Sequence, residues 1–120
     1  MTSRPDKVVI VGQGYVGLTL AVRAVEVGFD VVGIEADDLR LARLRRGESY
    51  LEDVSDGQLA ACRDSGRYTV SSDPAAAEHF DIAVVTVPTP LREGVPDLSF
   101  IEASARALGP YLRSGATVIL

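Results

Sequence analysis

Short apolar runs alternate with segments of helical periodicity along the whole chain, and this alternation constrains the fold more than any other feature. The runs are rich in β-branched residues and occupy residues 7–12, 30–35, 67–71, 81–87 and 116–120. Because these runs are mostly apolar throughout, they predict strands buried on both faces, as in a parallel sheet covered by helices. We therefore expect a doubly wound α/β fold of the Rossmann type, truncated after its fifth strand.

Helix signals fill the segments between these runs. Residues 15–28 predict a helix, since apolar residues such as Val16 and Leu20 recur at helical spacing before the glycine at 28. A second helix is predicted over residues 37–47, which begin with acidic residues and end with arginines and a glycine.

Three further patterns predict where later helices begin. Ser55 with Gln58, and Ser99 with Glu102, stand at capping-box spacing, in which each residue bonds a free N–H group at the helix start. Residues 73–80 begin with Asp-Pro, an N-cap followed by a first-turn proline, and predict one or two helical turns.

Length and composition limit the possible functions. At 120 residues the chain is one domain, and its 47% hydrophobic and 24% charged residues are those of a globular protein. A net charge of -5 argues against nucleic acid or an anionic membrane as a partner. No apolar run is long enough to span a membrane, and residues 1–6 do not resemble a signal peptide, so we expect a cytoplasmic protein.

A glycine-rich turn, "VGQGYVG", follows the first predicted strand and opens the first helix. Gly12 allows the tight turn, Gly14 lets a pyrophosphate approach bare backbone, and Gly17 lets helix and strand touch. The N–H groups of Tyr15 and Val16 would then face the anion at the positive end of the helix dipole. The alternative is a glycine turn kept only for packing.

Two charged residues follow at informative positions. Glu35 ends the second run at about the 20-residue offset at which a carboxylate meets the adenosine ribose, and a carboxylate there favours NAD over NADP. The alternative for Glu35 is an acid at the start of a helix. Arg40 leaves NADP open, because an arginine near this ribose can accommodate a 2′-phosphate, and it can equally be a solvated helical residue.

The stretch "TVPTPLREGVPDLSF", residues 86–100, forms a proline-rich loop after the fourth predicted strand. In doubly wound folds that strand lies beside the first, so Val87, Pro88 and Thr89 are expected to face the glycine turn. Prolines stiffen the loop before any ligand binds, and the Thr89 hydroxyl is available to a ligand. The alternative is an ordinary connection from strand to helix.

The motifs "GQGYVGL", "VPTPL" and "PDLSFIEA" together resemble the nucleotide-sugar dehydrogenases, the UDP-glucose/GDP-mannose dehydrogenase family, over nearly the whole chain. The pattern is most similar to members that oxidise UDP-N-acetyl-hexosamines. The resemblance implies that residues 1–120 are the N-terminal NAD-binding domain of a longer, homo-oligomeric enzyme of polysaccharide biosynthesis. Such enzymes oxidise the C6 alcohol of a nucleotide sugar to a carboxylate by two hydride transfers to NAD.

The resemblance also implies roles for individual residues. Val16 would present its N–H group to the pyrophosphate, and Glu35, where the family usually has Asp, would hold the adenosine ribose. Arg40, where a Lys is common, would support the same region, and the proline loop around Thr89 would line the cofactor cleft. The extra methylene of Glu35 would slightly change the position of its carboxylate relative to the ribose.

The family's catalytic residues and substrate domain are expected beyond residue 120, so no catalytic residue is assigned and the 120 residues alone should bind NAD without oxidising a sugar. Cys62 is predicted to be a buried or half-buried thiol on a helix and His79 a surface residue. The acidic residues between 48 and 56 are predicted to be solvated, with no metal bound. Two alternatives stay open: a non-catalytic nucleotide-binding module, and another Rossmann dehydrogenase such as a 3-hydroxyacid type.

Overall fold

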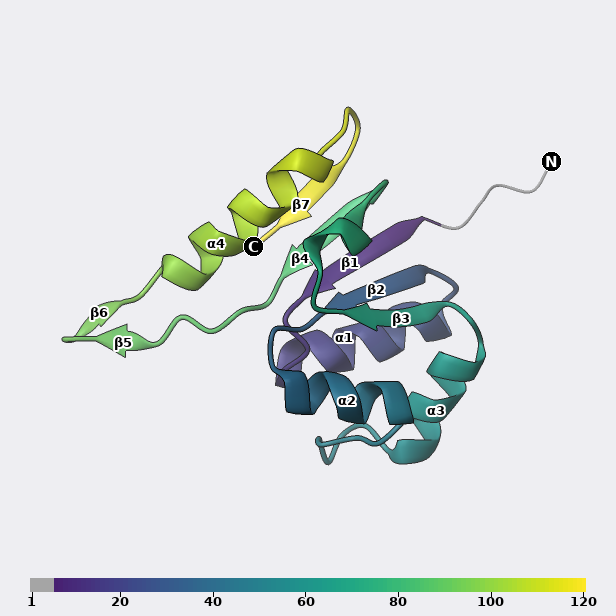
Figure 1. Ribbon diagram of the computed structural model, residues 1–120. Helices are drawn as coiled ribbons and strands as arrows, with labels where there is room; N and C mark the ends of the chain where they lie inside the picture. The colour runs from purple at the N-terminus through teal and green to yellow at the C-terminus, as the bar shows by residue number, and fades with distance from the viewer. Residues whose placement is uncertain (1–5) are drawn as a thin grey trace.

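A five-stranded parallel sheet forms the centre of the computed structural model, which describes residues 6–120 (Figure 1). The strand order is β3-β2-β1-β4-β7, so the chain moves outward from β1 and then crosses back to place β4 on the other side of β1. The strands are β1 Lys7–Val11, β2 Asp30–Ile34, β3 Tyr68–Ser71, β4 Ile82–Val85 and β7 Thr117–Ile119. The predicted doubly wound fold is confirmed. The interpretation of the start of the chain as unlike a signal peptide falls almost wholly outside the described residues.

Helices cover both faces of the sheet. One face carries α1 Tyr15–Glu26, α2 Asp38–Arg46 and α3 Asp56–Asp64, and the other carries α4 Ser99–Leu108 (Figure 1). Two single 3-10 turns, η1 Pro74–Ala77 and η2 Gly109–Tyr111, pack with α4. Within residues 6–120, none of the helices combines the length and the apolar character that a membrane span requires.

The two faces are buried in separate hydrophobic clusters. Successive side chains of a strand point to opposite faces. Accordingly, Val8 and Ile10 of β1 pack into a cluster with buried residues from α1, α2 and α3. Val9 packs into the other cluster with Phe80 and Leu108. This double burial explains why the strands read as continuous apolar runs.

The valine and leucine whose spacing predicted α1 do not form its buried face. Val16 is 63% exposed and Leu20 is 40% exposed, whereas Leu18 and Ala21 are fully buried. The cause is a very close approach at Gly17, where a Cβ atom would lie 1.8 Å from the carbonyl oxygen of Gly12. Contact at this point turns the neighbouring residues toward the sheet and the periodic valine and leucine away from it.

One of the two predicted capping boxes forms. The Ser55 hydroxyl accepts a hydrogen bond from Gln58 N at 3.1 Å, and Ser55 N donates to the Gln58 side chain at 3.0 Å. The predicted box of Ser99 and Glu102 is wrong, because Ser99 is already the first helical residue of α4. Asp97 serves that helix start instead, accepting a hydrogen bond from Ser99 N at 2.9 Å.

The proline-rich stretch contains a small hairpin that the sequence interpretation missed. The fourth strand ends at Val85 rather than at residue 87, and β5 Leu91–Arg92 then pairs antiparallel with β6 Val95–Pro96. The turn residues Glu93 and Gly94 both have positive φ, 54° and 79°, as a type I′ hairpin turn requires. Figure 1 shows the hairpin projecting away from the sheet.

Candidate functional site

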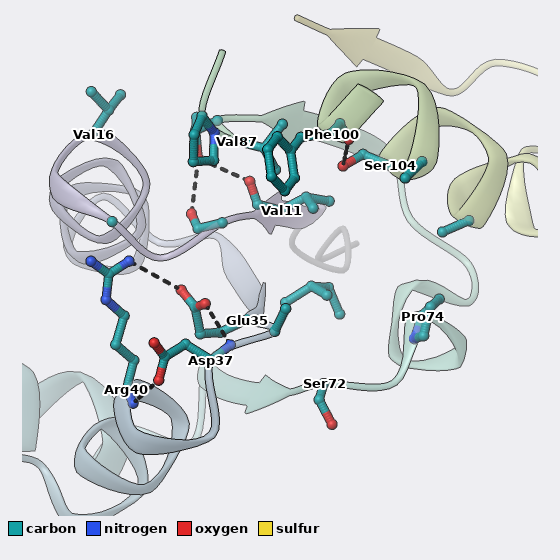
Figure 2. A pocket seen from close by; sticks show the side chains of 18 of the residues that line it. Val11, Val16, Glu35, Asp37, Arg40, Ser72, Pro74, Val87, Phe100 and Ser104 are labelled. Atoms are coloured by element: carbon teal, nitrogen blue, oxygen red, sulfur yellow. Dashed lines mark hydrogen bonds and ion pairs between the residues drawn. The ribbon is translucent and has the colours of Figure 1, made fainter. Parts of the chain in front are cut away.

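A cleft of about 840 Å³ opens where the strand order reverses, outside the carboxyl ends of β1, β2 and β4 (Figure 2). Doubly wound sheets bind their ligands at this position. The residues that line the cleft come from the glycine turn, the ends of β2 and β3, the segment after β4 and one face of α4: Val11, Gly12, Gly14, Tyr15, Val16, Ile34, Glu35, Ala36, Asp37, Arg40, Ser72, Pro74, Thr86, Val87, Pro88, Phe100, Ala103, Ser104 and Ala107.

Gly12 and Gly17 are explained by contacts inside the protein. Gly12 has a φ of 92°, and a Cβ atom there would lie 2.8 Å from the carbonyl oxygen of Thr86. Gly17 faces the Gly12 carbonyl and is not among the residues that line the cleft. Both glycines therefore let α1 cross closely over the end of β1, as the sequence predicted for the turn and the helix contact.

Gly14 is different, because nothing in the protein requires a glycine there. Its φ of -79° suits any residue, and the nearest atom to an added Cβ is the Arg40 Nη1 at an ordinary 3.7 Å. The residue borders the cleft. A position that is open within the chain yet lacks a side chain fits a ligand that approaches the bare backbone, as a pyrophosphate does.

The start of α1 offers hydrogen-bond donors to such a ligand. The first N–H groups of a helix have no partner within the helix. At α2 and α3 the side chains of Asp37 and Ser55 cap these groups, whereas the N-cap of α1 is Gly14 and supplies no side-chain cap. Tyr15 and Val16, where the sequence predicted anion contacts, line the cleft at the positive end of the helix dipole.

Glu35 lies at the floor of the cleft with only 6% of its surface exposed. One carboxylate oxygen accepts a hydrogen bond from Gln13 N at 2.9 Å. The other accepts one from Asp37 N at 3.0 Å, which Figure 2 shows. Each oxygen can accept a further bond. The helix-start role that was the alternative for Glu35 belongs to Asp37, which accepts bonds from the N–H groups of residues 39 and 40.

Arg40 lies between the carboxylate and the glycine turn. Its Nη1 is 4.0 Å from a Glu35 oxygen, and its guanidinium lies 5.4 Å from the centroid of the Tyr50 ring. Burial, followed by the charge of Glu35, raises the pKa of Tyr50 to about 12. The phenol is therefore protonated at neutral pH and donates to the carbonyl oxygen of Gln13. No sequence pattern predicted a role for Tyr50, which lies in a loop.

The segment after β4 meets the glycine turn, as the sequence predicted. Val87 and Pro88 line the cleft, but Thr89 is exposed and is not among the lining residues. The hydroxyl that reaches the turn belongs instead to Thr86, whose Oγ1 is 2.9 Å from Val11 O and 2.8 Å from Gly12 O. The strand ends earlier than predicted, so the threonine beside the turn is the one nearer to β4.

One wall of the cleft comes from α4, which the sequence interpretation did not include in the site. Phe100, Ala103, Ser104 and Ala107 recur at helical spacing and line the cleft. Figure 2 shows Phe100 beside Val87. The helical spacing of these residues is visible in the sequence, but the sequence does not show that this face of α4 lies toward the cleft.

Other residues singled out in the sequence lie away from the cleft. Cys62 is buried, as predicted, and burial raises the pKa of its thiol. His79 is exposed, as predicted, with its Nε2 at 3.4 Å from a Glu78 oxygen. The acids of residues 48–56 contact separate partners: Glu48 pairs with Arg46, Asp53 accepts from the Tyr15 hydroxyl, and Asp56 accepts from Ser49 N. Across residues 6–120, no three His, Cys, Asp or Glu side chains gather as metal ligands would.

These features define a class of protein. A glycine turn whose middle glycine is kept free for a ligand, and a carboxylate at the end of the next strand, form the dinucleotide-binding site of Rossmann-type domains. The family model described as "UDP-glucose/GDP-mannose dehydrogenase family, NAD binding domain" matches residues 6–120. The chain therefore belongs to this family, is its NAD-binding domain, and takes NAD as its cofactor.

Individual relatives support the same assignment. The chain is 38% identical over 116 residues to a UDP-glucose 6-dehydrogenase of Pseudomonas aeruginosa, covering 92% of this chain and 25% of that protein. It is 34% identical over 113 residues to an NDP-N-acetyl-D-galactosaminuronic acid dehydrogenase of Ralstonia nicotianae, covering 92% and 26%. A solved UDP-D-ManNAc dehydrogenase from Pyrococcus horikoshii superimposes with a TM-score of 0.89 at 26% identity, covering 93% and 27%. The chain thus spans about a quarter of the length of these relatives.

Proposed function

We propose that this domain serves an NAD-dependent nucleotide-sugar 6-dehydrogenase that oxidises the C6 alcohol of a UDP-sugar to a carboxylate in two hydride transfers. Bound NAD would supply the hydride acceptor. Family membership carries the proposal, since the relatives of highest identity reported above are named as dehydrogenases of nucleotide sugars. That membership also argues against a 3-hydroxyacid type of Rossmann dehydrogenase.

The pyrophosphate of NAD is assigned to the start of α1. Support comes from Gly14, which no internal contact requires, and from the first-turn N–H groups of Tyr15 and Val16, which receive no side-chain cap. Gly12 and Gly17 contribute indirectly, by letting the helix start lie against the end of β1. The arrangement favours an anion over a neutral ligand because the donors and the helix dipole act in the same direction.

The adenosine half of NAD is assigned to the opposite side of the cleft. Glu35 would accept hydrogen bonds from the ribose hydroxyls with the lone pairs that its two backbone donors leave free. A 2′-phosphate would bring negative charge against this carboxylate, which favours NAD over NADP. Arg40 lies close enough to both Glu35 and Gly14 to contact ribose or phosphate oxygens.

The adenine ring is assigned to the apolar wall of α4 and the segment after β4. Phe100, Ala103 and Ala107 line this part of the cleft with Val87 and Pro88. Flat apolar surface with few polar groups suits a heteroaromatic base. The proposal gives Thr89 no contact, because its side chain is exposed outside the cleft lining.

Two measurements test the proposal. Calorimetry with NAD, NADP and ADP-ribose should give a clear preference for NAD over NADP with the 120-residue chain, without turnover of any sugar. The complete gene product should form NADH when supplied with a UDP-hexose or a UDP-N-acetyl-hexosamine. NAD binding without turnover of any nucleotide sugar by the complete product would instead favour a non-catalytic nucleotide-binding module.

The cellular setting is part of the same proposal. We assign the protein to polysaccharide biosynthesis in the cytoplasm, as part of a homo-oligomer whose other domains bind the nucleotide sugar. The support is the family membership and the exposed apolar side chains of Leu91, Val95 and Leu98, which suit a protein contact. Cell fractionation of the complete product tests its location, and light scattering tests its oligomeric state. A monomer in the soluble fraction would contradict the proposed homo-oligomer and leave the rest of the proposal standing.

A further inference from the structure

We propose that Gln13 is a positioning residue, whose side chain fixes the glycine turn so that Glu35 is held ready for the adenosine ribose. The inference rests on the proposed placement of that ribose at Glu35. Gln13 lies between Gly12 and Gly14, at a position that the glycine motif leaves open to any residue. It is nevertheless 0% exposed, which is unusual for an uncharged polar side chain of this size.

All the polar atoms of the Gln13 side chain have partners. Its Nε2 donates to Ile10 O at 3.1 Å and to Gly12 O at 3.2 Å, and its Oε1 accepts from the Tyr68 hydroxyl at 2.7 Å. Burying an amide is costly unless it is hydrogen-bonded, and these contacts offset that cost. The amide is therefore held in one orientation rather than simply filling space.

The neighbouring strand makes room for this amide. A Cβ atom at Gly33 in β2 would lie 2.6 Å from both Cδ and Oε1 of Gln13. Tyr68, at the start of β3, supplies the hydroxyl donor from the next strand outward. Residues on two separate strands are thus matched to one side chain of the glycine turn.

The link to the site runs through a single peptide group. The carbonyl of Gly12 and the N–H of Gln13 belong to the same planar peptide unit and point in opposite directions. Gln13 Nε2 and Thr86 Oγ1 both reach the Gly12 oxygen, at 3.2 and 2.8 Å. The N–H on the other side of that unit donates to Glu35 Oε1 at 2.9 Å. Holding the oxygen therefore aims the N–H at the carboxylate.

A positioning role and a purely structural role make different predictions. If Gln13 only fills the core, replacing it and its partner by apolar residues of similar shape changes stability and leaves ligand preference alone. If it positions Glu35, the same replacement frees the peptide unit and weakens recognition of the ribose hydroxyls in protein that is still folded.

The experiment compares ADP with 2′-deoxy-ADP by calorimetry, because the two differ only in the 2′-hydroxyl, one of the ribose hydroxyls that Glu35 would bind. We expect the wild-type protein to prefer ADP by about tenfold. The double variant Gln13→Leu with Tyr68→Phe should lose most of that preference, as should Glu35→Gln. Adding Glu35→Gln to the double variant should cause no further loss, because the residues act through one contact.

Controls separate the possible outcomes. Val54→Ala, at a buried position in the loop before α3, should lower the melting temperature and keep the ADP preference. If the double variant is folded and keeps the full preference, Gln13 is core packing and the inference is wrong. If Glu35→Gln keeps it, the ribose placement itself fails, and the inference fails with it. Should the double variant not fold, Tyr68→Phe alone must still reduce the preference, and an unchanged preference would overturn the inference.

Discussion

Gly17 and Gly12 stand so close that a Cβ atom on Gly17 would lie 1.8 Å from the Gly12 carbonyl oxygen. The obstacle is backbone rather than a flexible side chain, and the Thr86 hydroxyl, at 2.5 Å from the same point, blocks a second direction. The first turn of α1 is therefore fixed against the end of β1 by the absence of one side chain. This contact sets where the helix start points, and with it the position of the proposed anion site.

Gly17→Ala is expected to destabilise the protein strongly. Either the helix or the turn must move to accept the methyl group, and forced overpacking of this kind costs about 1–3 kcal/mol or more. Denaturant unfolding followed by circular dichroism measures the loss. Ala105→Gly, at an exposed position of α4, is a control for changes in helix propensity alone, which are worth about 1 kcal/mol. Equal unfolding free energies for wild type and Gly17→Ala would show that this approach is not tight.

A substitution at Gly14 should affect ligand binding rather than stability. Gly14→Val is expected to abolish measurable NAD binding, since its side chain would extend where the pyrophosphate is assigned. The folded protein meets no such obstacle, because only Arg40 lies within 4 Å of an added Cβ, so stability should change by no more than about 1 kcal/mol. Calorimetry with NAD and a melting curve on the same preparation give both values. Unchanged NAD affinity would mean that the phosphates lie elsewhere.

The sequence predicts the fold and the centre of the site because both depend on local patterns. Strand runs and helix signals alternate in order, and the positions of Gly14 and Glu35 relative to the first two strands determine that they meet at one edge of the sheet. Arg40 follows from its place in the first turn of α2. These predictions needed spacing along the chain and no knowledge of distant contacts.

The remaining features depend on contacts between segments far apart in sequence. The bond between Gln13 and Tyr68 joins the glycine turn to β3 across 55 positions of the chain, and no periodicity in the sequence predicts it. The β5–β6 hairpin needs a positive φ at Glu93, which glutamate rarely adopts. Of the two turn positions, only Gly94 therefore carries a residue type that predicts this turn. Thr86, rather than Thr89, reaches the turn because β4 ends two residues earlier than its apolar run.

Glu35 should determine the choice between the two nicotinamide cofactors. Glu35→Gln is expected to weaken NAD binding by about tenfold, since hydrogen bonds to a charged group are worth about 1.5–3 kcal/mol. Binding of NADP should fall less or improve, because the charge that opposes its 2′-phosphate is removed. Glu26→Gln, an exposed acid on α1 that pairs with Arg23, is the matched control and should change neither affinity. Equal losses for both cofactors would contradict the ribose role.

Alkaline pH should destabilise the protein through the buried phenol of Tyr68 and the half-buried phenol of Tyr50. Burial raises the pKa of Tyr50 from 10.0 to about 12, and burial also raises the pKa of Tyr68. The unfolded chain ionises these groups near pH 10, whereas the folded protein does not, so their stabilising contribution is present below pH 10 and is lost as pH rises toward 12. The free energy of unfolding, measured in urea at several pH values, should fall over this interval. Tyr50→Phe should lower stability at neutral pH, because the bond to Gln13 O is lost, yet show a shallower fall with pH. An identical slope in that variant would mean that Tyr50 ionises as freely in the folded protein as in the unfolded chain.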